Sequence, residues 1–184
     1  GTIVNDDTNW SISTTDVAKN EGNSGFTTFT YTVTRLGIPL AGTVNWSVSG
    51  ISGITGSDFY GYGGNLPRGS LSFASTDTSK IFTVNVAGDS SFEGDDSFKV
   101  SLTTATSNIA AYPTAASVTS TIVNDDASLA ISPANATLLE GNQGSTPFTF
   151  TVNRGGAVDQ VTTVNWSVSG NVSASDFNGY GGVL

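Results

Sequence analysis

The sequence predicts an all-β protein whose strands run antiparallel in a two-sheet sandwich. Three observations support this fold class. Apolar and polar residues alternate with a period of two, β-branched and aromatic residues fill the apolar positions, and turns rich in Gly, Ser and Asn separate the alternating segments. No segment shows the 3.6-residue periodicity of a helix, so both layers of the domain are expected to be sheets.

The alternation defines the strands one by one. In the second expected strand, Phe29, Tyr31 and Val33 alternate with Thr residues, which predicts one buried and one polar face. Trp46 has the inward phase of the third strand and is expected in the core, as is Trp166 at the corresponding later position. The seven expected strands are 9–18, 26–35, 42–49, 69–74, 80–87, 96–104 and 116–123. Seven short strands of this spacing indicate an immunoglobulin-like β-sandwich.

The chain also repeats itself. The segment 2–7 returns at 121–126, 119 residues later, and the segment 43–50 returns at 163–170. A period of this length corresponds to a whole domain rather than to a short solenoid repeat. We therefore expect three parts: residues 1–7 as the tail of a preceding repeat, 8–126 as a complete repeat, and 127–184 as the first half of a second one. The sequence has no initiator Met and no signal segment, so we expect it to be a piece of a longer protein.

Composition excludes several classes of function. The net charge is −9 with only six basic residues, which argues against nucleic acid and anionic membranes as partners. No apolar run is long enough to cross a bilayer. The absence of His, Cys and Met removes the usual ligands of zinc, copper and iron. Without His, Cys or a nucleophile elbow the sequence is not expected to encode an enzyme.

Acidic residues segregate to one end of the predicted sandwich. Successive strands mostly alternate in direction, so the first, third, fifth and seventh strands end at the same pole. Eight carboxylates follow those four ends, whereas Asp77 alone lies at the opposite pole, near Arg35 and Lys80. We call the eight residues the acidic pole: Glu21, Asp58, Asp89, Glu93, Asp95, Asp96, Asp125 and Asp126.

So many carboxylates in one place predict a bound cation. Two carboxylates about 5 Å apart repel each other by roughly 3 kcal/mol at an effective dielectric constant near 20. Several such pairs are costly for a domain whose total stability is roughly 5–15 kcal/mol. Ca²⁺ takes about six to eight oxygen ligands from flexible loops, whereas Mg²⁺ demands tighter octahedral geometry. The sequence therefore favours a calcium site, and a solvated acidic loop end is the alternative.

Four motifs in this order resemble the Calx-β domain, the calcium-binding module of sodium–calcium exchangers and of many bacterial surface proteins. They are Glu21-Gly22 after the first strand, Gly56 to Phe59 before the fourth, Asp89 to Phe98 between the fifth and sixth, and Thr121 to Asp126 at the end. The resemblance covers residues 8–126 and the first part of a second unit in 127–184.

The resemblance implies a set of calcium ligands. It implies Glu21, Asp58, Asp89, Glu93, Asp125 and Asp126 as ligands, with Asp95 as an extra ligand or a neighbour of one. This chain differs from exchanger domains at Gly88, where those domains often have a second acid, and at Asn124, so a smaller number of ligands and ions is expected. Glu140 and Asp176 form only a partial second site, and Asp6 and Asp7 belong to a preceding unit, so one well-formed site is expected.

The function expected from these observations is a calcium-binding structural repeat. The ion would stiffen a tandem array in a bacterial extracellular adhesin or surface protein, whose partners are neighbouring repeats or identical chains. An alternative is a subunit of a self-assembling filament, in which strand exchange between chains completes the half-repeat and covers its open sheet edges. A lesser alternative is the calcium sensor of a transporter. The adhesion target, the calcium affinity and glycosylation are left open by the sequence.

Overall fold

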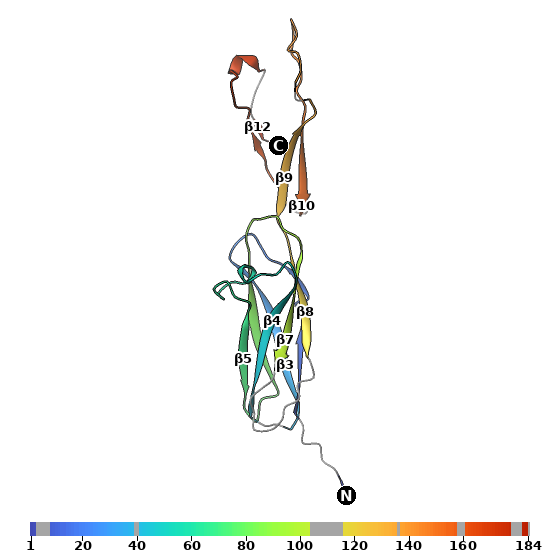
Figure 1. Ribbon diagram of the computed structural model, residues 1–184, viewed down its shortest axis with the longest axis vertical. Coiled ribbons are helices and arrows are strands. Elements are labelled where there is room, and N and C mark those ends of the chain that lie inside the picture. Colours follow the sequence, from blue (N-terminus) through green and yellow to red (C-terminus); the bar gives the residue numbers. More distant parts are fainter. Residues whose placement is uncertain are drawn as a thin grey trace. The chain divides into compact units, whose positions relative to one another are not determined.

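The computed structural model describes residues 1–2, 8–38, 41–103, 116–135, 137–157, 161–177 and 182–183. The chain divides into two compact units, unit 1 (Gly1–Asp126) and unit 2 (Ala127–Leu184). Within the described ranges every regular element is a strand, apart from two short 3-10 turns, so the predicted all-β class is confirmed (Figure 1). The predicted tail of a preceding repeat, with Asp6 and Asp7, falls almost entirely on residues 3–7, which lie outside the described residues.

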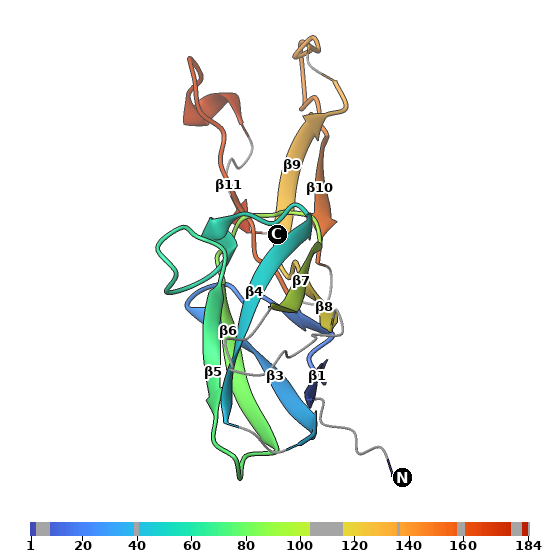
Figure 2. The ribbon, with the colours of Figure 1, turned by 60° about the horizontal axis from the view of Figure 1, so that its bottom comes forward.

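The described residues of unit 1 form two sheets. The first has the order β1 (Thr8–Thr14), β3 (Phe26–Gly37) and β6 (Ser79–Ala87). The second has the order β2 (Ala18–Asn20), β8 (Ser117–Val123), β7 (Asp96–Thr103), β4 (Gly42–Ser52) and β5 (Arg68–Phe73). Every pairing is antiparallel except that of β2 with β8, which is parallel. Figure 2 shows the long β4 beside β5.

The first predicted strand, 9–18, is in fact two strands that belong to different sheets. The break lies at Asp16, whose Oδ2 accepts a hydrogen bond from the Thr30 amide at 2.7 Å and pairs with Lys19 at 2.9 Å. The Asp16 carbonyl accepts the Ser120 hydroxyl at 2.8 Å. The described part of unit 1 therefore has eight strands, because the chain leaves β1 and continues as β2 in the other sheet.

One hydrophobic core joins the two sheets of unit 1. Phe29 and Tyr31 of β3 and Phe98 of β7 are fully buried, and the rings of Phe29 and Phe98 meet edge to face with centroids 5.5 Å apart. Trp46 stacks on Phe82 at 4.3 Å, which confirms its predicted place in the core. Burying one large apolar side chain stabilises the fold by about 1.5–3 kcal/mol, so the core holds the strand ends, and the loops that follow them, in place.

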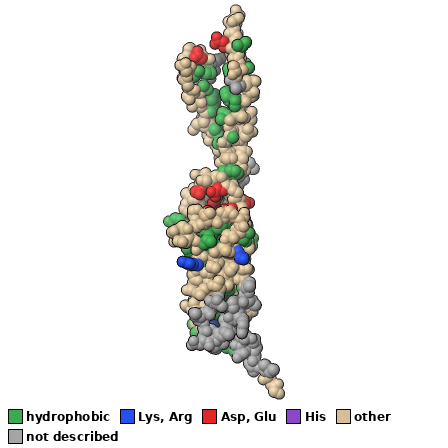
Figure 3. Space-filling view, viewed as in Figure 1, with side chains coloured by type: hydrophobic (Ala, Val, Ile, Leu, Met, Phe, Trp, Pro, Cys, Tyr) green, Lys and Arg blue, Asp and Glu red, His purple; other side chains and the backbone are tan. Residues whose placement is uncertain are grey.

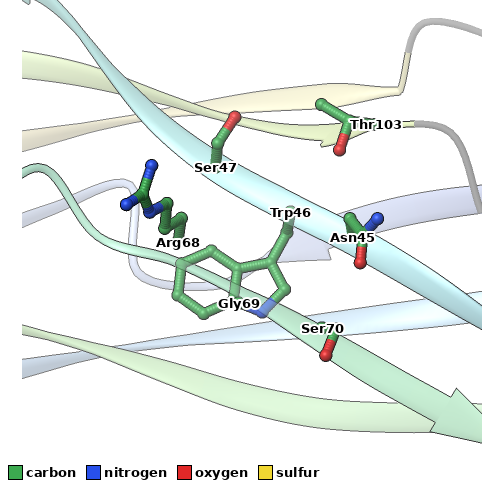
Figure 4. Close-up of a pocket in the computed structure, with 7 residues that line it drawn as sticks. All are labelled: Asn45, Trp46, Ser47, Arg68, Gly69, Ser70 and Thr103. Carbon is green, nitrogen blue, oxygen red and sulfur yellow. The ribbon is translucent and has the colours of Figure 1, made fainter.

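A shallow groove lies where Trp46 crosses Gly69 (Figure 4). The two residues are directly paired across β4 and β5, and the indole takes the space of a side chain at position 69, where a Cβ would come within 2.9 Å of the ring. Arg68 is the one charged side chain among the described residues that line the groove. The glycine is thus explained by packing.

Unit 2 repeats the beginning of unit 1. Strand β9 (Ala127–Pro133) pairs antiparallel with β10 (Phe150–Gly156), and β11 (Asn165–Trp166) pairs with β12 (Gly182–Val183). The 3-10 turn η2 (Ala174–Asp176) corresponds to η1 (Gly56–Asp58) of unit 1. No helix in the described ranges has the length and apolarity that a membrane span requires.

Candidate metal centre

The acidic pole is built from the loops and strand ends at one end of unit 1, where Figure 3 shows Asp and Glu side chains gathered. Glu21 directly follows β2, and Asp125 and Asp126 come shortly after β8. Because β2 and β8 are parallel neighbours, with Asn20 opposite Val123, the two chain segments leave the sheet side by side. The Glu21 amide accordingly donates to the Val123 carbonyl at 3.2 Å.

Asn124 joins the loop between β6 and β7 to the residues after β8. Its side-chain oxygen accepts the Glu93 amide at 3.2 Å, and its side-chain amide donates to the Asp126 carbonyl at 3.1 Å. Its own backbone amide donates to Asp95 Oδ1 at 3.1 Å. We call these three hydrogen bonds the Asn124 latch. The sequence reasoning treated Asn124 only as a missing acid and did not find this role.

The loop after β2 is held by a separate contact. The Gly22 amide donates to Asp125 Oδ1 at 3.0 Å, across 103 residues of sequence. The Thr27 hydroxyl donates to the Glu21 carbonyl at 2.7 Å and closes the same loop from within. The pole therefore has an ordered framework of protein hydrogen bonds around its carboxylates.

Two carboxylates of the pole are buried. Glu21 is 7% exposed and Asp126 is 4% exposed. Burial raises the pKa of Glu21 to about 7, and the carboxylates of Asp89, Glu93, Asp126 and Asp125 add to this rise. Burial also raises the pKa of Asp126, with Asp125 and Asp89 contributing. Loss of solvation and mutual repulsion thus both disfavour the charged forms.

Asp126 has an oxygen that the protein leaves unsatisfied. Its Oδ2 is buried and has no hydrogen-bond partner among the described residues. A buried polar atom without a partner costs about 1–3 kcal/mol, and more when it is charged. A hard cation would compensate such an oxygen, so the chemistry of this donor fits Ca²⁺.

The remaining acids lie around this buried pair. Partial desolvation raises the pKa of Glu93, with Asp89 and Asp58 as its strongest acidic neighbours. The same cause, followed by Asp58 and Asp95, raises the pKa of Asp96, whose carboxylate lies against the backbone of Gly53. The predicted residues of unit 1 are therefore near enough to influence one another electrostatically.

Some of their oxygens are already committed to the backbone. Asp58 Oδ2 accepts the Thr55 amide at 2.6 Å and so closes η1, and Asp89 Oδ1 accepts the Ser91 amide at 2.7 Å. Within the part of the chain that the structure describes, no three acidic side chains come together as a metal-binding group. The structure brings the acids to one pole but does not assemble them into a ligand cage.

Gly88 shows why one acid is absent from the pole. Its amide donates to the Gly25 carbonyl at 3.2 Å, and a Cβ at this position would overlap the Gly22 carbonyl. An aspartate at position 88 would force the two loops apart. The departure from the exchanger pattern therefore follows from the close approach of two backbones.

The predicted partial site of unit 2 has none of this environment. Glu140 is exposed. Asp176 Oδ2 accepts the Ser173 amide at 2.7 Å, and hydrogen bonds from Ser173 lower the pKa of Asp176. No acidic neighbour contributes to that shift. These two residues lie in local turns without the other half of an acidic pole.

Charges at the opposite end of unit 1 are paired instead. Asp77 lies 2.8 Å from Lys80, and this contact, with the Ala74 amide, lowers the pKa of Asp77. Arg35 is buried and donates to the Ala74 and Ser75 carbonyls at 3.1 and 3.0 Å. Among the described residues of unit 1, the acidic charge without a basic partner is thus concentrated at the acidic pole.

No family model and no curated protein matches the chain. Among solved structures, the apo-form Calx CBD1 domain aligns with a TM-score of 0.50 at 21% identity, covering 65% of this chain and 98% of that one. CBD12 from CALX1.2 aligns with a TM-score of 0.53 at 21% identity, covering 67% of this chain and 49% of that one. The chain thus spans about half the length of the second structure. At this level of identity the likeness establishes the fold, and the chain has a Calx-β-like fold as the motifs indicated.

Proposed function

We propose that unit 1 is a calcium-binding structural module, a seven-stranded immunoglobulin-like sandwich if β1 and β2 are counted as one interrupted strand. One observation carries the proposal: the buried Asp126 has an unsatisfied oxygen and is electrostatically coupled to the buried Glu21. Two buried carboxylates in one place are unfavourable unless a cation or a proton neutralises them. The crystal structures of Calx CBD domains have the same fold, which supports this assignment.

The ion would be held first by the buried carboxylates of Glu21 and Asp126 and by their neighbour Asp125. Glu21, Asp125 and Asp126 supply carboxylate oxygens from the two segments that β2 and β8 hold side by side. Asp89 and Glu93 lie on an exposed loop and can move towards the ion. Asp58 and Asp95 each accept a hydrogen bond from a backbone amide with one carboxylate oxygen, and the other oxygen can bind the ion. Because Ca²⁺ needs about six to eight oxygens, binding is coupled to closure of the loop between β6 and β7.

The position of the site in the sequence supports a structural role in a tandem array. Only Asn124, Asp125 and Asp126 separate β8 from β9, and two of the three are proposed ligands. An ion that fixes their backbone reduces the conformational freedom of this connection. Modules outside cells work with weak sites, of roughly 10⁻⁴–10⁻³ M. We propose that the chain is part of a non-enzymatic, extracellular or cell-surface protein of a bacterium, in which calcium stiffens neighbouring repeats that present an adhesive part.

Calorimetric titration of the chain with calcium tests the proposal. The unaltered chain is expected to show a saturable heat and a higher melting temperature in calcium than in EDTA. Asp126→Asn should weaken binding at least about tenfold, because one charged ligand is lost from a buried position. Asp77→Asn is the matched control, since it makes the same chemical change at the opposite end, and its titration should be unchanged. Absence of a binding heat in millimolar calcium would refute the proposal.

A filament subunit is the second candidate function. The observation that favours it is the exposure of large apolar side chains on unit 2. Light scattering over a range of chain concentrations tests it. Growth of assemblies that is lost on substitution of an apolar residue of β10 would support the filament, and a monomer at every concentration would exclude it.

A further inference from the structure

The outer face of the five-stranded sheet of unit 1 carries two cations and no carboxylate among its described residues. Arg68 and Lys99 lie opposite Ser47 and Ser49, which alternate along β4 with buried residues. Since successive side chains of a strand point to opposite faces, both cations lie on the outer face. Asp96, the one acid described within these five strands, has the inward phase instead. This face is therefore locally positive in a chain whose net charge is −9.

Most other cations of unit 1 already have partners. Lys19 and Lys80 form ion pairs at 2.9 and 2.8 Å, and Arg35 is buried against backbone carbonyls. Arg68 is exposed, and among the described residues no ion pair or hydrogen bond engages its guanidinium. A guanidinium has five donors in a planar fork that matches the two oxygens of a carboxylate. Arg68 is therefore available to bind an anionic group.

The groove beside Arg68 offers uncharged hydrogen-bonding groups. Its volume of about 500 Å³ lies in the range of small-ligand sites. It crosses β5, β4 and β7, a width of about 10 Å, and Figure 4 shows Arg68 at one end and Thr103 at the other. Ser70 and Thr103 both lie opposite Asn45, so the three side chains form a row across the sheet. Amide and hydroxyl groups in such a row are complementary to the hydroxyl groups of a sugar.

The outward side chains of β4 are the same in both repeats. The segment 43–50 recurs unchanged at 163–170, whereas the outward Ser11 of β1 corresponds to Ala130. Packing explains why the buried residues of the segment recur. It does not require identical residues on the polar face, where other small polar side chains would serve as well. Their recurrence indicates that the outer surface of β4 is itself used.

The groove is complete in unit 1 only. Trp166, the counterpart of Trp46, is 38% exposed against 7%, contrary to its expected place in the core. The Phe82 ring stacks on Trp46, and residues 127–184 contain no counterpart of Phe82 or of Arg68. The inference below therefore concerns unit 1.

The acidic pole is too distant from Arg68 to repel a bound anion strongly. Strand β4 runs from Ser47, opposite Arg68, to Ser52, whose partner Ser97 adjoins Asp96. These five residues span about 17 Å, roughly twice the Debye length at physiological ionic strength. Repulsion between the pole and an anion on Arg68 is therefore largely screened, and the groove does not depend on the calcium site.

We propose that this groove binds a carbohydrate that carries a carboxylate, a uronic acid residue. Arg68 pairs with the carboxylate, and the neutral polar side chains exchange hydrogen bonds with the sugar hydroxyls. A simple anion would leave those neutral groups unused. A carboxylate of a second copy is a poorer occupant, because two chains of net charge −9 repel each other. The module would then contact a polysaccharide itself, in addition to any role in stiffening an array.

An NMR titration of the full chain with the trimer of galacturonic acid tests the proposal. EDTA in the buffer prevents calcium from bridging the sugar carboxylates to the acidic pole, so a negative result leaves the calcium proposal untouched. Saturable shifts are expected at the amides of residues 45–47 and 68–70. The neutral methyl ester of the same trimer should bind at least about tenfold more weakly, because the charge-assisted contact is lost. Absence of saturable binding would overturn the proposal.

Matched variants identify the residues responsible. Arg68→Gln should weaken binding at least about tenfold, and Ser70→Ala about threefold. Both positions are exposed, so neither change should affect folding. Lys80→Gln makes the same change of charge outside the groove and should leave binding unaltered. Equal losses with Arg68→Gln and Lys80→Gln would show non-specific attraction and refute the site.

Two further outcomes would reject this choice of ligand. Triglutamate that binds as tightly as the sugar trimer would show that the groove accepts any carboxylate and that the neutral side chains do not read sugar hydroxyls. Self-association of the chain that is lost in Arg68→Gln would instead assign Arg68 to a contact between copies. Sedimentation of both chains over a range of concentrations measures this association.

Discussion

Units 1 and 2 have the same local conformations but different environments. Gly22 and Gly141 both adopt positive φ, 86° and 83°. The Thr27 hydroxyl reaches the Glu21 carbonyl at 2.7 Å, and the hydroxyl of Thr146 reaches the carbonyl of its own loop glutamate at 2.8 Å. In η1 and η2 an aspartate accepts the amide three residues earlier, at 2.6 and 2.7 Å. Turns and caps are therefore determined within a few residues of sequence.

Burial separates the two units. Glu21 is buried and its pKa is raised to about 7, whereas its counterpart Glu140 is exposed. The loop around each glutamate is the same, so the difference comes from the strands that pack on it. In unit 1 those strands include β8 and the acids that follow it. The comparison teaches that these turns form from local sequence, whereas an acidic pole requires the strands that pack around it.

The largest effect is expected from removal of one core ring. Phe29→Ala should cost unit 1 about 3–5 kcal/mol, because it leaves a cavity in a packed core. Phe148→Ala, at the corresponding position of unit 2, should change the stability of that unit by no more than about 0.5 kcal/mol. Hydrogen exchange of β3 and β10 peptides measures the two separately. Equal losses of stability in the two variants would mean that the Phe148 side chain is buried in unit 2 as the Phe29 side chain is in unit 1.

A smaller effect is expected from pH in calcium-free buffer. The folded state holds the Glu21 proton more tightly than the unfolded chain, since the pKa is about 7 against 4.5. Stability should therefore fall as the pH rises from about 5 to 8, by about 2.5 kcal/mol if Glu21 acts alone. Urea unfolding in EDTA at the two pH values measures the change.

Substitution of the two glutamates identifies the group responsible. Glu21→Gln should remove most of this pH dependence and raise stability at pH 8. Glu140→Gln should leave the profile unaltered, because Glu140 is exposed. A pH dependence that survives Glu21→Gln would assign the effect to the other raised acids, Asp126 and Glu93.

The smallest effect is expected at the Asn124 latch. Asn124→Ala removes two side-chain hydrogen bonds, each with a net value of about 1 kcal/mol or less on an exposed loop. Calcium binding should weaken about fivefold, and the Glu93 amide should exchange faster in EDTA. Asn65→Ala is the control, because the side-chain amide of Asn65 donates to the carbonyls of Tyr62 and Gly63 in its own loop. Unchanged exchange at Glu93 would show that the latch does not order the loop.

The sequence by itself determined the strands and the set of acids. Alternation of apolar and polar residues reports which face of a strand is buried, so the strand positions were predictable. Trp46 was placed in the core for the same reason. Positive-φ glycines and capping aspartates determine the backbone conformation of only three or four neighbouring residues. The conformations of the loops can therefore be predicted from local sequence. Because successive strands alternate in direction, the positions of the strand ends then predicted eight carboxylates at one pole.

Only the tertiary structure decided how those acids meet. Periodicity says nothing about which strand becomes the neighbour, so the change of sheet at Asp16 and the parallel pairing of β2 with β8 could not be predicted. That pairing places Glu21 beside Asp125, and it buries Asp126 with one oxygen unsatisfied. The Asn124 latch and the lack of space at Gly88 arise from contacts between segments about 30 to 66 residues apart. Such contacts depend on the packing of whole strands, which local sequence patterns do not encode.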